Sequence, residues 1–138
     1  MNKYMDIAVE EAIIAFNEGN VPVGAVIVNN GKIISRSHNT KNTTNISINH
    51  AELLCITEAC KCLNTWYLND CELYVTLKPC DMCSAAIAES RIKKVYYLLN
   101  SNYDDNMLKS IENINFLQIN DNFKYNELLS NFFKMLRN

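Results

Sequence analysis

Near the start of the chain, the apolar positions predict an amphipathic helix. They recur at steps of three and four residues, a spacing that gathers them on one face of a helix. Gly19 follows as a helix stop. We expect this apolar face to lie against a sheet. The positions are Met5, Ala8, Val9, Ala12, Ile13 and Phe16.

An antiparallel hairpin is predicted next. Residues 23–28 form a run rich in β-branched side chains, and residues 32–37 form a second short run. Asn29-Asn30-Gly31 separates the two runs, and Asn and Gly tolerate the positive φ angles of a tight hairpin turn. Residues 38–49 then indicate a polar loop.

Helical and strand patterns alternate after this loop. Helical spacing covers residues 50–62 and 80–90, whereas residues 71–77 and 94–99 have the character of strands. The Lys78-Pro79 pair closes the first of these strands.

The last part of the chain adds three elements to this series. The pattern predicts a short helix near Met107, a strand at residues 116–119 and a helix at residues 125–135. Alternation of this kind favours an α/β sandwich. No internal repeat and no linker rich in Pro, Gly or Ser divides the chain, so we expect a single domain of residues 1–138.

Composition narrows the class of protein. The chain has 138 residues, of which 49% are hydrophobic and 20% charged, as in an ordinary globular domain. Its formal net charge of -2 gives no overall field that would attract nucleic acid, so such binding would need local basic patches. No apolar run is long enough for a membrane span, and the first residues do not have the pattern of a signal peptide. We expect a cytoplasmic protein without a membrane partner.

Two of the six cysteines carry the first chemical signal. Pro79-Cys80-Asp81-Met82-Cys83 places two thiols three positions apart at a predicted strand-to-helix turn, where both sulfurs can face one metal ion. The amides of a first helical turn would also favour the thiolate forms. A redox pair or a chance spacing is the alternative reading of this motif taken alone.

His50-Ala51-Glu52 supplies the second signal. The chain has only two histidines, and an imidazole at a predicted helix start is a natural third ligand for zinc. Three protein ligands leave the fourth tetrahedral position open to water, as in catalytic sites. Zinc lowers the pKa of this water, and a carboxylate that is not a ligand can move its proton. Glu52 fits this role if it shares the first helical turn with His50.

A closed zinc knuckle is the structural alternative. A fourth thiolate would complete a Cys3His site and would leave Glu52 as an ordinary helix residue. His38, the other histidine, is treated as a loop residue. The candidate fourth ligands are Cys55, Cys60, Cys62 and Cys71.

Together the two motifs resemble the signature of zinc deaminases, H-x-E followed by P-C-x-x-C. Further segments extend the resemblance to bacterial tRNA-specific adenosine deaminases over nearly the whole chain. These segments are residues 21–28, 73–77, 90–92 and 128–135.

The resemblance implies a cytidine-deaminase-like fold, a three-layer α/β/α sandwich with a central mixed five-stranded sheet. It implies one Zn²⁺ per subunit, a homodimer, and hydrolysis of adenosine to inosine at the wobble position of a tRNA anticodon arm, with release of ammonia. The target base would be flipped into the pocket. Carried over by position, the metal ligands are His50, Cys80 and Cys83; Glu52 is the proton shuttle; and Asn39, Val23 and the backbone amide of Ala51 hold the base.

The chain departs from the family pattern near these motifs. Lys78 stands where Glu is usual, Asp81 follows the first cysteine, and Ser84-Ala85-Ala86 replaces Ala-Gly-Ala. Residues 98–105 also differ from the family's loop that borders RNA. A deaminase of a free nucleobase or nucleoside, such as guanine or cytosine, is therefore the alternative, and a non-catalytic zinc protein is a third reading.

Basic side chains outside these motifs are the candidates for contact with RNA phosphates. They are Arg91, Lys93, Lys94, Lys134 and Arg137.

Overall fold

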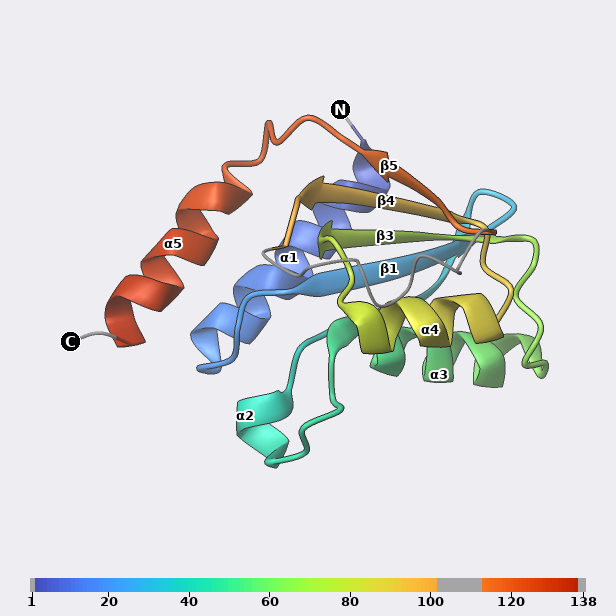
Figure 1. Cartoon of the computed structure of the whole chain (residues 1–138), viewed down its shortest axis with the longest axis horizontal. Coiled ribbons are helices and arrows are strands. Elements are labelled where there is room, and N and C mark those ends of the chain that lie inside the picture. The colour runs from blue at the N-terminus through green and yellow to red at the C-terminus, as the bar shows by residue number, and fades with distance from the viewer. Residues whose placement is uncertain (1, 102–112, 137–138) are drawn as a thin grey trace.

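The fold is an α/β/α sandwich built on one mixed sheet (Figure 1). The structure is a computed structural model and describes residues 2–101 and 113–136. Five strands lie in the order β2-β1-β3-β4-β5. Helix α1 covers one face of the sheet, α3 and α4 lie side by side on the other, and α5 lies beyond the ends of the strands, in contact with α1. The predicted three layers and five strands are thus confirmed.

The bounds of the elements follow the sequence pattern closely. The helices are α1 Lys3–Asn17, α2 Lys41–Thr44, α3 Ala51–Leu63, α4 Asp81–Glu89 and α5 Tyr125–Leu136. The strands are β1 Gly24–Asn29, β2 Lys32–His38, β3 Cys71–Leu77, β4 Lys94–Leu99 and β5 Asn115–Gln118. The helix expected near Met107 lies outside the described residues.

Strand direction reverses on both sides of β1 and is constant from β3 to β5. Strand β1 is antiparallel to both β2 and β3, whereas β3, β4 and β5 are parallel to one another. Asn30 and Gly31 both have positive φ angles, 51° and 76°, as the predicted hairpin turn requires. Because the parallel strands end at one edge of the sheet, the turns that follow them meet there.

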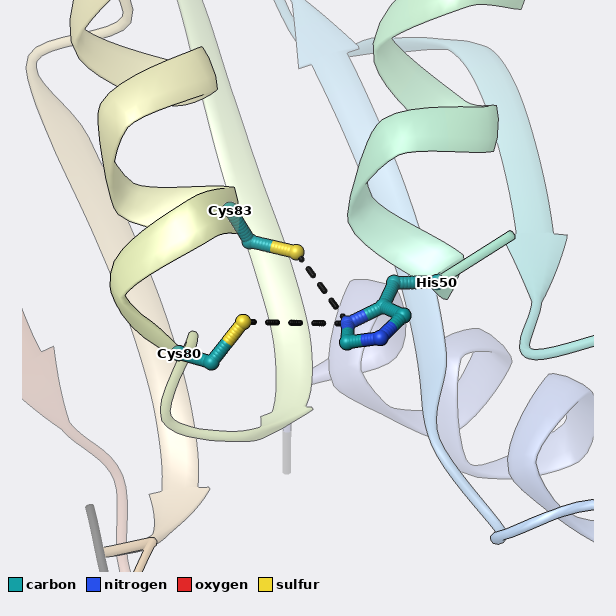
Figure 2. A group of neighbouring side chains, drawn as sticks. All are labelled: His50, Cys80 and Cys83. Carbon is teal, nitrogen blue, oxygen red and sulfur yellow. Dashed lines mark hydrogen bonds between the residues drawn. The ribbon is translucent and has the colours of Figure 1, made fainter. Parts of the chain in front are cut away.

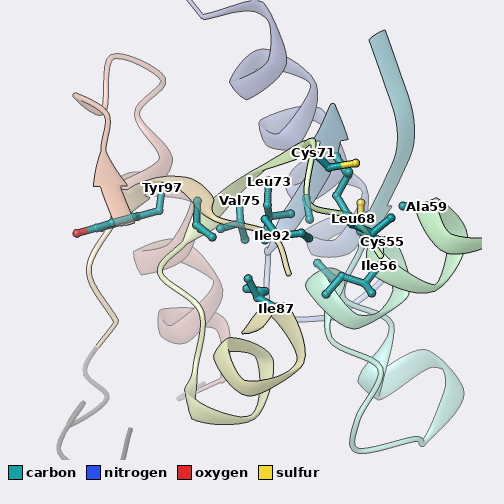
Figure 3. Packing of buried hydrophobic residues seen from close by; sticks show 14 of the residues in the cluster. Cys55, Ile56, Ala59, Leu68, Cys71, Leu73, Val75, Ile87, Ile92 and Tyr97 are labelled. Carbon is teal, nitrogen blue, oxygen red and sulfur yellow. The ribbon is translucent and has the colours of Figure 1, made fainter. Parts of the chain in front are cut away.

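Alternating side chains of the strands form a core on each face. Val26 of β1 and Tyr74 of β3 form one cluster with Met5 of α1 and Tyr125 of α5. The opposite cluster packs under α3 and α4 (Figure 3). It includes Ala25, Ile27, Cys55, Ala59, Leu73, Val75, Ile87 and Val95.

One correction concerns the predicted polar loop at residues 38–49. Within it, Lys41–Thr44 form the short helix α2. The buried Oδ1 of Asn20 accepts hydrogen bonds from the amides of Asn42 and Thr43, at 2.8 and 3.1 Å. These amides belong to a first helical turn, whose donors have no partner within the helix. The helix therefore depends on a distant residue, which local sequence could not show.

Among the described helices, none combines the length and the apolar character that crossing a membrane requires.

Gly24 marks the closest approach of α1 to the sheet, and replacing it tests this packing. A Cβ at position 24 would lie 1.9 Å from the carbonyl oxygen of Ala8 and 2.6 Å from the amide nitrogen of Ala12. We expect Gly24→Ala to lower the free energy of unfolding by about 3 kcal/mol or more, since the contact is with backbone. Gly19→Ala is the control, because it meets no atom within 4 Å and adds only the strain of its positive φ. Chemical denaturation measures both, and equal losses would contradict the packing.

Candidate metal centre and active site

The side chains of the two motifs meet where α3 and α4 begin. His50 is the N-cap of α3, and Cys80 is the N-cap of α4. Cys83 lies one turn further along α4. The two helices start at the same edge of the sheet, so residues that are far apart in sequence face one another (Figure 2).

The distances among these three side chains fit a tetrahedral metal site. Nδ1 of His50 lies 3.7 Å from Sγ of Cys80 and 3.4 Å from Sγ of Cys83, and the three ligand atoms all lie within 4.8 Å of one another. Zinc bonds of about 2.3 Å to sulfur and about 2.0 Å to nitrogen, at a tetrahedral angle, would separate these atoms by about 3.6 Å. The donor set and its spacing therefore suit zinc.

Hydrogen bonding and burial prepare these groups electrostatically. Hydrogen bonds from Cys83 and His50 lower the pKa of Cys80 to about 4, against the opposing effect of burial. The hydrogen bond to Cys80 raises the pKa of His50, and the charge of Glu52 acts in the same direction, while burial and the charge of Lys41 oppose it. At neutral pH the site thus carries a thiolate at Cys80, as the helix start predicts.

Glu52 lies beside this group in the same helical turn as His50. It is the second residue of α3, and its side chain is buried, with 4% exposure. Burial raises the pKa of Glu52 to about 7. A carboxyl group with a pKa near neutrality can both accept and return a proton. The condition set by the sequence, that His50 and Glu52 share the first turn, is met.

A cavity of about 210 Å³ opens onto these residues. Every residue that the sequence analysis assigned to the base, Val23, Asn39 and Ala51, lines this cavity together with His50 and Glu52. The amide of Ala51 belongs to the first turn of α3, where amides have no acceptor within the helix. Other lining residues that the sequence analysis did not single out are Val21, Lys41, Leu77 and Ser101.

Asn39 is the residue that joins the walls of this cavity. Its Nδ2 donates to the carbonyl oxygen of Val21 at 3.2 Å, and its Oδ1 accepts from the amide of Lys41 at 2.9 Å. The amide of Asn39 donates to the carbonyl oxygen of Val23 at 3.0 Å. One hydrogen on Nδ2 and one lone pair on Oδ1 are left over from these bonds, so Asn39 can shape the wall and still meet a ligand.

Two buried residues that sequence reasoning missed support the same wall. Asn20 holds α2 in place, and the hydroxyl of Tyr125 donates to the carbonyl oxygen of Pro22 at 2.6 Å. Tyr125 comes from α5, at the far end of the chain, and is fully buried. Only a long-range contact reveals either role; in the sequence Asn20 is one of many asparagines.

The alternative ligands lie elsewhere. In the part of the chain that the structure describes, the three-residue group contains none of the other cysteines. Cys55 and Cys71 are buried in the core, as expected, and Cys62 is exposed. His38 lies at the end of β2 and its ring nitrogens contact Glu11 and Glu18, each at 2.8 Å. A closed Cys3His site is therefore not formed.

The structure shows where the residues that depart from the family pattern lie. Ser84 is buried and its hydroxyl donates to the carbonyl oxygen of Pro79 at 3.5 Å. Asp81 begins α4, where a negative charge suits the helix dipole. Lys78 lines the cavity. Of the altered loop at 98–105, residues 102–105 lie outside the described residues.

This fold, with a His-x-Glu and a Pro-Cys-x-x-Cys motif at one cavity, defines a deaminase of the cytidine-deaminase-like superfamily. The chain belongs to the MafB19-like deaminase family, whose sequence profile matches residues 1–137. It is accordingly a hydrolase.

Individual relatives give finer comparisons. A tRNA-specific adenosine deaminase of Aquifex aeolicus is 43% identical over 98% of this chain and 95% of its own length. A structure from studies of A-to-I editing by tRNA:A34 deaminases at the wobble position has a TM-score of 0.78 and 33% identity, covering 84% of this chain and 96% of that one. A guanine deaminase of Bacillus subtilis has a TM-score of 0.69 and 34% identity, covering 100% of this chain and 96% of that one.

The burial of Glu52 predicts a pH-dependent loss of stability in metal-free protein. The folded-state pKa of about 7 is above the value of about 4.3 in an unfolded chain. The folded protein therefore keeps the Glu52 proton to a higher pH than the unfolded chain does. The free energy of unfolding falls as pH rises from the unfolded-state pKa through the folded-state pKa. Glu52→Gln removes this loss, so we expect it to exceed the wild type in stability at pH 8 by up to about 4 kcal/mol, and by less toward pH 5.

Thermal unfolding of chelator-treated protein across this pH range measures the difference. Glu58→Gln on the exposed side of α3 is the matched control, because the Glu58 side chain is 59% exposed. Parallel curves for wild type and Glu52→Gln would contradict the assigned burial.

Proposed function

We propose that this protein converts adenosine to inosine at the wobble position of a tRNA anticodon, releasing ammonia. The observation that carries the proposal is the similarity to the Aquifex aeolicus tRNA-specific adenosine deaminase along almost the entire length of both chains. In structure, the A-to-I editing deaminase and the Bacillus subtilis guanine deaminase have nearly equal identity to this chain, 33% and 34%, but the editing deaminase has the higher TM-score, 0.78 against 0.69. Together, these similarities support tRNA over the free base that the sequence analysis kept as an alternative.

The proposed metal is one Zn²⁺ held by His50, Cys80 and Cys83. When bound, zinc acts as a Lewis acid that makes a water molecule nucleophilic near neutral pH. Cys80 provides a thiolate, because its pKa is lowered, and Nδ1 of His50 faces both sulfurs. The three residues leave one side of the site facing the cavity, where a substrate can reach it.

Glu52 is the proposed proton shuttle. It is close to the ligands, is buried, and has a pKa near neutrality, so its carboxylate can take a proton from the attacking water. As the water oxygen bonds to C6 of the base, the π bond between C6 and N1 breaks and Glu52 passes the proton to N1. Glu52 then takes the proton of the new hydroxyl group and gives it to the amino nitrogen, the bond between C6 and this nitrogen breaks, and ammonia leaves.

The base is held by residues of the cavity wall. Val23 supplies an apolar contact to the ring, the remaining hydrogen-bonding capacity of Asn39 meets its polar edge, and the amide of Ala51 donates to it. In this proposal the substrate is an anticodon loop. Because a base within an RNA loop must leave its stack to enter a cavity, the wobble nucleotide is flipped out of the loop.

The proposal also includes the oligomeric state and the cellular compartment. We treat residues 1–138 as one deaminase domain that works as a homodimer in the cytoplasm, as the resemblance to the tRNA deaminases implies. The molar mass in solution tests the dimer: a monomer at the concentration of the assay would count against it.

Metal content tests the ligand set directly. We expect purified wild type to hold about one zinc per chain, and His50→Ala or Cys83→Ser to lose most of it, because two ligands bind zinc far more weakly than three. His38→Ala is the matched control, since His38 contacts carboxylates outside the site. Elemental analysis measures the content. Full zinc in both ligand variants would refute the assignment.

Inosine formation in an anticodon stem-loop tests the activity. Wild type should produce inosine and ammonia from the wobble adenosine. Glu52→Gln should lower kcat by about 10²-fold to 10⁴-fold while zinc stays bound, because it removes the proton carrier and no ligand. Free guanine, cytosine and adenosine are assayed in parallel. Turnover of a free base together with silence on the stem-loop by fully zinc-loaded protein would replace the proposal with the free-base alternative.

A further inference from the structure

Three of the basic residues named from sequence, Arg91, Lys93 and Lys94, lie away from the cavity, and Arg137 lies outside the described residues. Lys94 begins β4 and pairs with Glu72 at the start of β3, whereas Leu77, which lines the cavity, ends β3. At about 3.3 Å per strand residue, these two ends are separated by roughly 17 Å. Arg91 lies just before β4 and donates to carbonyl oxygens at the end of α4. Arg91, Lys93 and Lys94 therefore belong to the opposite edge of the sheet.

Two other lysines line the cavity itself. Lys41 begins α2, and Lys78 lies in the turn between β3 and α4. The sequence analysis gave Lys41 no role and counted Lys78 as a departure from the family pattern. They come from segments far apart in the chain and place two positive charges at one cavity, although the protein as a whole carries a net charge of -2.

The two lysines have different surroundings. Nζ of Lys78 lies 5.8 Å from the ring centre of Tyr97 and 5.3 Å from that of Phe116, so two aromatic rings favour its position. The amide of Lys41 is bound by Asn39, which also lines the cavity. Lys41 itself is exposed, as expected for a charge that reaches a ligand from the solvent side.

We propose that Lys41 and Lys78 form a phosphate-binding pair that contacts the substrate on either side of the nucleoside in the cavity. The inference rests on the proposed function, since a flipped nucleotide within RNA keeps a phosphate on each side of its ribose. An ammonium group on a flexible stem binds such a phosphate as a point charge. The same chemistry would bind the phosphate of a free nucleotide, and the experiment separates the two sources.

Binding of a labelled anticodon stem-loop RNA, measured by fluorescence anisotropy at several KCl concentrations, tests the pair. Lys41→Met and Lys78→Met remove the charge but keep an unbranched side chain that can still contact the aromatic rings. Each variant should weaken binding several-fold at low salt and reduce the slope of log K against log[KCl] by about 0.7, the value for one phosphate contact in a single strand. The double variant should lose about twice that slope.

Lys94→Met is the matched control, because Lys94 is exposed at the opposite edge of the sheet. It should leave affinity and slope unchanged. Zinc content is measured for every variant, so that a disturbed metal site is not mistaken for a lost phosphate contact. Unchanged affinity and slope in both cavity variants would overturn the pair.

Nucleoside and nucleoside 5′-monophosphate substrates form the second arm and keep the two proposals distinct. If wild type forms inosine in RNA and the cavity variants bind as wild type does, only the phosphate pair fails. If wild type leaves RNA unedited but prefers a monophosphate to its nucleoside, and Lys41→Met or Lys78→Met removes that preference, the pair stands and the tRNA function fails. A wild type that binds neither RNA nor monophosphate better than nucleoside overturns the pair.

Discussion

The site depends above all on the packing of α3 and α4 next to each other on one face of the sheet, with their first turns level. Small buried residues of α3, Ala51, Cys55 and Ala59, allow the helix to lie close to the strands, and Ile87 anchors α4 on the same cluster (Figure 3). This packing sets the distance between His50 and the two thiols. A shift of either helix along its axis would separate the ligands by more than a metal bond tolerates.

Helix starts also supply the electrostatics of the site. Unpaired amides at the first turn of α4 favour negative charge, so Cys80 is well placed to be a thiolate. The amide of Ala51 in the first turn of α3 has no acceptor within its helix and can donate to a ligand. The same packing buries Glu52 and holds its pKa near neutrality. Burial of this carboxyl group destabilises the metal-free fold at neutral pH, and it makes proton transfer in both directions possible. Stability and activity are thus opposed at one residue.

A second set of contacts fixes the cavity wall. Asn20, Asn39 and Tyr125 tie together the segment before β1, the helix α2 and the start of α5. Two of these bonds end on backbone carbonyl oxygens of the segment before β1, and the third comes from a backbone amide of α2. The cavity wall is therefore held by buried amide and hydroxyl groups, while the apolar clusters hold the layers.

The sequence predicted most of the helices and strands from the spacing of apolar positions, three to four residues in helices and two in strands. The Cys-x-x-Cys and His-x-Glu spacings indicated the proposed metal ligands and proton carrier, and the resemblance indicated Asn39 and Val23. The three-dimensional packing was needed to show that α2 forms, that Asn20 and Tyr125 support the cavity, that Lys41 and Lys78 line it, and that Arg91, Lys93 and Lys94 lie at the other edge. These features arise from contacts between segments distant in sequence, and a side chain's distant neighbours are fixed by the packing of the sheet and its two helical layers.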